Sequence, residues 1–113
     1  MEHTLDATNQ RLGRLASNIA RILQGKHCAT YAPRLSGTDR VTVIHASKIT
    51  IGGAKAVQKI YYRHTGYMGH LREKNFKTAF EQSPKAVLLH AVYNMLPKNR
   101  LRPTRLKRLT IQL

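Results

Sequence analysis

The chain has 113 residues, 42% of them hydrophobic, which predicts one domain over residues 1–113 with a modest core. Twenty Lys and Arg against five Asp and Glu give a formal net charge of +15, so we expect a polyanionic partner, nucleic acid first and a membrane surface second. The single Cys excludes an internal disulfide framework, no apolar run approaches the roughly 20 residues of a membrane span, and the first residues lack a secretory-signal pattern, so we expect a soluble cytosolic protein.

The first quarter of the chain predicts a strand followed by a helix. Residues 3–7 have the composition of a short strand. Residues 8–26 place apolar side chains three and four positions apart, which is typical of an amphipathic helix. Thr8 or Asn9 is expected to cap the start of this helix, and Gly25 its end.

The middle of the chain alternates turns with extended segments. A loop is predicted at 27–40, and VTVIHA at 41–46 is a β-branched apolar run that suits a strand buried on both faces. Residues 48–55 begin as an extended piece and end in a glycine turn. The aromatic run at 58–63 predicts another strand, whereas residues 64–75 are too rich in glycine and polar groups to predict regular structure.

The last third predicts two helices, a basic segment and a strand. Phe76 and Phe80 indicate a short helix, and Ser83 before Pro84 is a strong start for a second one, which Pro97 ends. Residues 97–108 carry six basic side chains, and LTIQL alternates like an edge strand. Strands alternating with helices predict an α/β fold built from βαβ units, with a largely parallel sheet covered by helices.

Signatures of catalysis, metal binding and cofactor binding are weak. Cys28 follows His27, but no nucleophile-elbow pattern occurs, and the five acids are scattered. His64 and His70 lack a second metal-ligand motif, and IGGAK at 51–55 lacks the remaining residues of a phosphate-binding loop. We therefore predict no catalytic residue, no metal, no cofactor and no small-molecule substrate.

The stretch YYRHTGYMGH at 61–70 gathers aromatic, cationic and glycine residues without a carboxylate. The plain interpretation is a strand end followed by a flexible turn. Because Tyr61 and Tyr62 point to opposite faces of a strand, one of them should be a core anchor and the other should face outward. Tyr, His and Arg planes stack on unpaired bases, so the composition favours an RNA-facing loop.

The basic segment at 97–108 is the second candidate surface. It is either a solvated basic helix or a source of phosphate contacts, and no acid follows Glu81 to pair with it. A membrane-binding helix is the poorer interpretation, since its apolar stripe is thin and Pro103 interrupts it unless that residue lies in the first turn.

Three stretches together resemble the L13 family of large-subunit ribosomal proteins. DATNQRLGRLASNIARILQGKH at 6–27 is similar to the family's opening D-A-x-x-x-x-L-G-R-L-A-S and later G-K. KIYYRHTGYMGHLR at 59–72 resembles its K-x-Y-Y-x-H-[ST]-G-x-x-G-G loop, with His70 in place of the last glycine. AVYNMLPKNRLRPTRLKRL at 91–109 resembles its A-V-x-G-M-L-P-K segment and the basic helix after it.

The resemblance implies a three-layer α/β/α fold around a four-stranded parallel sheet, with a basic C-terminal helical segment. It also implies a structural role in the large subunit in the cytoplasm, bound to large-subunit (23S-type) ribosomal RNA and neighbouring ribosomal proteins, with an early part in assembly and no catalysis. The implied RNA-binding residues are Tyr62, Arg63, His64, Thr65, Gly66 and Tyr67 in the loop, Lys98, Arg100, Arg105, Lys107 and Arg108 in the basic segment, and Arg14, Lys26, Lys48, Lys55 and Lys59 elsewhere.

Two other functions remain open from the residues alone. One is a small RNA-modifying or nucleotide-binding α/β protein, suggested by the glycine turn at 52–53 and the His-rich loop. The other is a free-standing basic module that binds DNA and RNA alike with a steep salt dependence.

Overall fold

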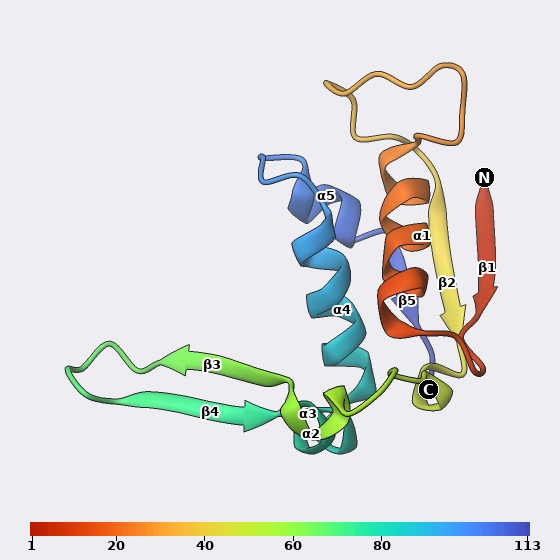
Figure 1. Cartoon of the computed structure of the whole chain (residues 1–113). Helices are drawn as coiled ribbons and strands as arrows, with labels where there is room; N and C mark the ends of the chain where they lie inside the picture. The colour runs from red at the N-terminus through yellow and green to blue at the C-terminus, as the bar shows by residue number, and fades with distance from the viewer.

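A computed structural model describes all residues, 1–113, and shows a body of helices and a sheet from which an arm extends (Figure 1). The strands are β1 (Glu2–Asp6), β2 (Arg40–Ile44), β3 (Ile60–His64), β4 (Leu71–Asn75) and β5 (Leu109–Ile111). The helices are α1 (Leu12–Gln24), the 3₁₀ turn η1 (Ala46–Lys48), α2 (Lys55–Gln58), α3 (Phe76–Gln82), α4 (Pro84–Met95) and α5 (Arg102–Leu106).

The body is organised around a parallel sheet in the order β1-β2-β5. His3 of β1 is in register with Val41 of β2, and Val43 of β2 with Ile111 of β5. Val41, Val43 and Ile111 are buried in one core with the apolar stripe of α1, and α4 packs along α1 (Figure 1). The core therefore lies between one face of the sheet and its helices.

The sheet has three parallel strands, so the prediction of a four-stranded parallel sheet is wrong, although the broader α/β assignment is confirmed. The extended piece near Thr50 makes only an isolated parallel bridge with Arg11, and the strand after it leaves the body for the arm. The prediction that β2 is buried on both faces is also wrong. Thr42 and Ile44 are only half-buried, because alternate positions of β2 point away from α1.

The ends of the two long helices follow the predicted chemistry in part. Gly25 ends α1, as predicted: it adopts a left-handed conformation, with φ of 77°, and its N–H donates a hydrogen bond to the Ile22 carbonyl. Neither Thr8 nor Asn9 caps the start of α1, because the helix begins only at Leu12, with Arg11 at the N-cap position. The hydroxyl and N–H of Thr8 both donate to Asp6. At α4 the prediction is confirmed, since the Ser83 hydroxyl accepts a hydrogen bond from the Ala86 N–H at 3.2 Å.

Strands β3 and β4 form an antiparallel arm that projects from the body (Figure 1). The prediction that residues 64–75 lack regular structure is therefore wrong, because Leu71–Asn75 is a strand. The arm and the long loop before β2 help to explain the Cα radius of gyration, which is 15.3 Å. A compact chain of this length would have a radius of about 13 Å.

The basic segment forms a short helix rather than a continuous one. Pro103 lies in the first turn of α5, where its missing N–H does no harm. The chain then enters β5, which is an edge strand as predicted, with Thr110 exposed and Ile111 buried. None of the helices has the length and hydropathy that a membrane span requires.

Candidate nucleic-acid interface

The Lys and Arg side chains have no acidic partners within the protein. The salt bridges of Asp6 and Asp39 are made with histidines and the terminal amino group, and no Lys or Arg lies within 4.0 Å of any carboxylate. The net charge of +15 is thus not neutralised by local pairing. Such a surface repels itself until an external anion binds it.

The arm presents apolar and basic side chains to solvent on both faces. Tyr62 is 62% exposed, and Met68 at the tip is 96% exposed. Arg63 lies directly opposite Arg72, a cross-strand pair of like charges that is unfavourable without a counter-ion. Isolated two-stranded ribbons are marginally stable in water, so the arm has the character of an element that is completed by a partner.

Tyr61 anchors the base of the arm, and Tyr62 points outward, which confirms the predicted division between the two tyrosines. The Tyr61 ring contacts the His90 ring edge-on, with centroids 5.6 Å apart, and lies 6.5 Å from the Phe76 ring. Burial raises the pKa of the Tyr61 hydroxyl above its ordinary value. The Lys59 ammonium lies 5.5 Å from the centre of the same ring, so this anchor also positions a cation.

A second cationic surface is a groove between the start of α1, the turn after Thr50 and α4. We call it the basic groove. Its cations are Arg11, Arg14, Lys55 and Lys59, and its floor includes Gly52 and Gly53. A Cβ atom at Gly52 would lie 3.6 Å from the Arg11 guanidinium, an ordinary contact distance, so the backbone of this turn runs directly beside that cation. Backbone N–H groups in such a turn, together with cations, suit a phosphate group.

His90 and Asn94 line the basic groove from α4 and were missed by the sequence analysis. They lie four positions apart, and the Asn94 amide is 3.1 Å from the His90 ring nitrogen. Residues four positions apart lie on the same face of a helix, so two polar residues at this spacing on an otherwise apolar helix indicate an outward face. This spacing could have identified His90 and Asn94 from the sequence. Arg11, which is not among the predicted RNA-binding residues, is exposed in the groove as well.

The basic segment divides into outward and inward side chains. Lys98, Arg100 and Lys107 are exposed. Arg105 is only 1% exposed and donates to the Leu35 carbonyl at 3.0 Å, so it is not available to a phosphate. Arg102 is buried as well, with its guanidinium 4.1 Å from the Tyr93 ring centre.

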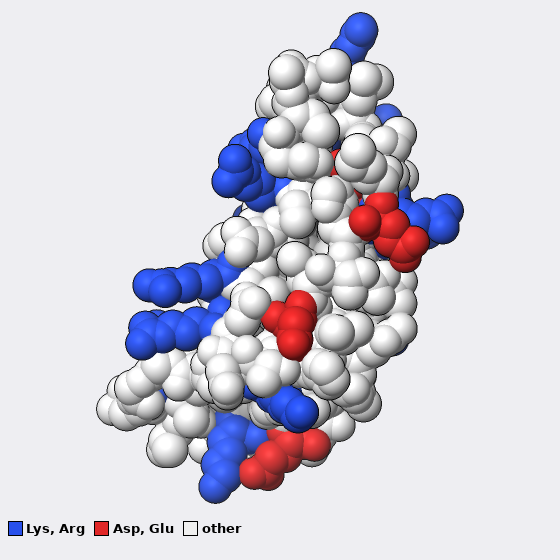
Figure 2. Space-filling view, turned by 90° about the vertical axis from the view of Figure 1, so that its right-hand side faces the viewer, with Lys and Arg blue, Asp and Glu red and all other residues white.

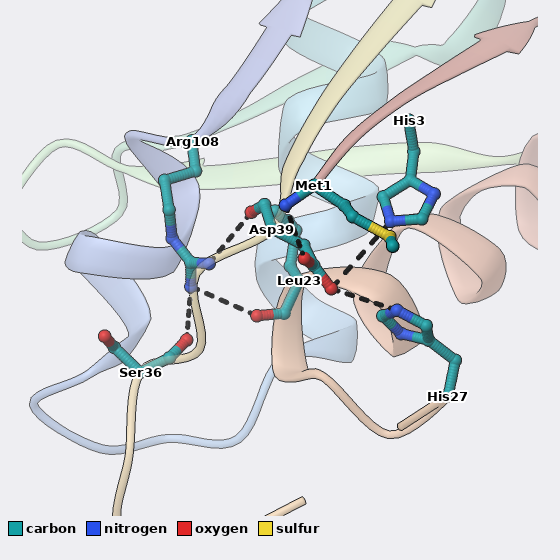
Figure 3. Close-up of polar contacts among 7 residues, drawn as sticks. All are labelled: Met1, His3, Leu23, His27, Ser36, Asp39 and Arg108. Atoms are coloured by element: carbon teal, nitrogen blue, oxygen red, sulfur yellow. Dashed lines mark hydrogen bonds and ion pairs between the residues drawn. The ribbon is translucent and has the colours of Figure 1, made fainter. Parts of the chain in front are cut away.

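Arg108 also points inward, toward the loop before β2 (Figure 3). Its guanidinium donates to the carbonyls of Asp39 at 2.8 Å, Leu23 at 3.1 Å and Ser36. Burial, and then the nearby Arg105 charge, lower the pKa of this guanidinium, which remains charged. Arg105 and Arg108 were both predicted to bind RNA, and their guanidinium groups donate to main-chain carbonyls of the loop before β2.

The remaining predicted residues lie on the surface but do not all meet. Arg63, His64, Thr65, Gly66 and Tyr67 are exposed on the arm. Lys26 and Lys48 are exposed outside the groove, at the end of α1 and in η1. On the face shown in Figure 2, Lys and Arg side chains extend mainly from the left-hand edge, whereas acidic side chains and a wide uncharged area occupy the centre and right.

Exposed cations without acidic partners, an aromatic arm and a glycine-lined groove define a small basic α/β protein of the nucleic-acid-binding class. The chain matches the family model described as Ribosomal protein L13 over residues 1–112, and it belongs to that family.

Relatives described as large ribosomal subunit protein uL13 extend the match. The protein of Lawsonia intracellularis is 48% identical over 107 residues, covering 95% of this chain and 74% of the relative. That of Clostridioides difficile is 44% identical over 109 residues, covering 96% and 76%. That of Natranaerobius thermophilus is 46% identical over 109 residues, again covering 96% and 76%.

Proposed function

We propose that this chain binds large-subunit ribosomal RNA through three exposed surfaces: the arm, the basic groove and the outward cations of the basic segment. As a member of the L13 family, it is a structural, non-enzymatic constituent of the large ribosomal subunit and works within the ribosome in the cytoplasm. The observation that carries this conclusion is the family match over residues 1–112.

The three surfaces contribute to RNA binding in different ways. Cations without acidic partners neutralise phosphates and release counter-ions, which supplies affinity independent of sequence. Aromatic side chains of the arm, chiefly Tyr62 and Tyr67, supply planes on which unpaired bases stack. The glycine turn at 52–53 lets a phosphate approach the backbone beside Arg11.

The positions of these surfaces support a role in joining RNA segments. The arm projects from one end of α4, whereas Lys98 and Arg100 follow its other end (Figure 1). The molecule measures 47 × 34 × 21 Å along its principal axes, so separate RNA segments fit against it at once. We propose that it lowers the repulsion between such segments early in assembly, and that its partners include 23S-type RNA and neighbouring ribosomal proteins.

Sedimentation tests the function directly. The chain carrying a small C-terminal epitope is expressed in a bacterial host, and lysates are fractionated on sucrose gradients at physiological salt. We expect the chain to migrate with large subunits and to persist there after a wash at moderate salt. Recovery of the folded chain only in the free fractions would contradict the proposal.

A further inference from the structure

One polar cluster lies away from the RNA-binding surfaces. His3 of β1, His27 after α1 and Asp39 before β2 converge from three separate segments (Figure 3). The Nε2 atom of His27 is 2.9 Å from Oδ2 of Asp39, and Nε2 of His3 is 3.8 Å from the same oxygen. The potential ligand atoms all lie within 4.8 Å of one another.

The cluster holds a buried nitrogen atom without a partner. Nε2 of His3 is shielded from solvent and makes no hydrogen bond, although it points toward Asp39. Buried polar atoms in native proteins are nearly always satisfied, so this nitrogen calls for a ligand. The Asp39 carboxylate is itself buried, and its other oxygen accepts a hydrogen bond from the terminal amino group at 3.1 Å.

The donor set and its spacing suit a transition metal. Two imidazoles and a carboxylate are typical zinc ligands, whereas magnesium and calcium prefer oxygen donors throughout. Ligand atoms about 2.0–2.1 Å from a tetrahedral zinc ion lie about 3.4 Å apart, which is between the two distances to Asp39 Oδ2. Small ring movements would therefore bring all three atoms into coordination.

No neighbouring Lys or Arg side chain binds the carboxylate of Asp39. The Arg108 guanidinium beside it donates to the main-chain carbonyl of Asp39 and not to the carboxylate. The carboxylate oxygen nearest both imidazoles is thus free of Lys and Arg contacts. The net charge of the chain lowers the affinity for any cation, and added salt screens that effect.

We propose that His3, His27 and Asp39 form a binding site for one divalent transition-metal ion, with Zn²⁺ as the best match. Bound there with water at its fourth position, the ion joins β1, the end of α1 and the start of β2. It acts next to Arg108, which holds the same loop from its other side (Figure 3). Its effect is to stabilise the body rather than to contact RNA.

The test uses the full chain, purified without a histidine tag and stripped with EDTA. Zn²⁺ is titrated calorimetrically at pH 7.5 in moderate salt, and the thermal midpoint is compared with Zn²⁺ and with EDTA. We expect one equivalent to bind and the midpoint to rise by several degrees, because the ion binds the folded state preferentially. Co²⁺ in its place should give visible d–d absorption bands.

Two variants separate this site from general histidine binding. His3→Phe keeps a ring on β1 and should lower Zn²⁺ affinity at least about tenfold, with folding checked by circular dichroism without metal. His70→Ala removes an exposed histidine of the arm and should leave affinity unchanged. The proposal is overturned if the folded wild-type chain binds no Zn²⁺, if His3→Phe binds it equally well, or if His70→Ala weakens binding as much.

Discussion

Arg105 and Lys107 show that neighbouring charges in one basic segment can have opposite roles. Arg105 is buried and donates to the Leu35 carbonyl, whereas Lys107 is exposed. Arg105→Ala removes a packed side chain and leaves a carbonyl unsatisfied, so we expect a loss of about 2–4 kcal/mol in the free energy of unfolding. Lys107→Ala should change it by less than about 0.5 kcal/mol. Urea unfolding measures both, and equal midpoints for the two variants would show that Arg105 does not hold the loop.

Asp6 makes the stability of the chain depend on pH. Hydrogen bonds from the Thr8 hydroxyl and N–H, and then from His45, lower the pKa of Asp6 from 3.8 to about 2. A carboxyl with a depressed pKa stabilises the folded state above pH 3.8, and this contribution is lost as the pH falls toward 2.

Asp6→Asn isolates this effect because it removes the charge and keeps an oxygen acceptor. The thermal midpoint of the variant should lie below that of the wild type at pH 6, and the two should converge near pH 2. A difference that stays constant across this range would mean that the charge of Asp6 is not responsible.

At the scale of elements, the two tyrosines of β3 should separate stability from RNA binding. Tyr61→Ala removes a ring packed near Phe76 and His90, and should cost about 2 kcal/mol of unfolding free energy. Tyr62→Ala should leave stability nearly unchanged and weaken binding to large-subunit RNA by about 1–3 kcal/mol, the value of one stacked base. Filter binding and thermal melts on both variants provide the comparison. RNA affinity equal to wild type in Tyr62→Ala would remove this ring from the interface.

The elements that could be predicted from the sequence are those that bury an apolar face. The apolar stripe of α1 and the alternation in β5 both reflect contact with the core, although the predicted ranges, 8–26 and 109–113, are longer than the helix and strand observed. The start of α4 was predicted correctly from Ser83 and Pro84. β4 was missed because LREKN is exposed at every position, so it has no core-facing pattern to recognise. LREKN forms a strand because it pairs with β3, and a local sequence pattern does not record that pairing.

The candidate interface could be predicted by composition but not by side-chain direction. The exposed arm residues follow from a stretch with aromatics, glycines and no carboxylate. The inward turn of Arg105 and Arg108 depends on where α5 places them relative to a loop some 70 positions earlier in the chain. The groove likewise joins Arg11, Lys55 and Asn94 from distant segments, which no local pattern records.

At the scale of the whole molecule, the number of phosphate contacts determines how RNA affinity depends on salt. Each lost contact should reduce the slope of log affinity against log salt concentration by about 0.7–0.9. Lys98→Ala with Lys107→Ala removes two outward cations of the basic segment without touching Arg105 or Arg108. We expect its slope with large-subunit RNA to fall by about 1.4–1.8 and its thermal midpoint to stay near that of the wild type.

The matched control is Lys77→Ala with Lys85→Ala, which removes the same charge from exposed positions on α3 and α4 outside the three surfaces. Both double variants carry a formal charge lower by two, so long-range attraction to RNA falls equally in each. A slope that falls only in the first variant locates phosphates at the basic segment. If the two slopes fall equally, RNA responds to the overall charge alone, and the basic segment is not a specific part of the interface.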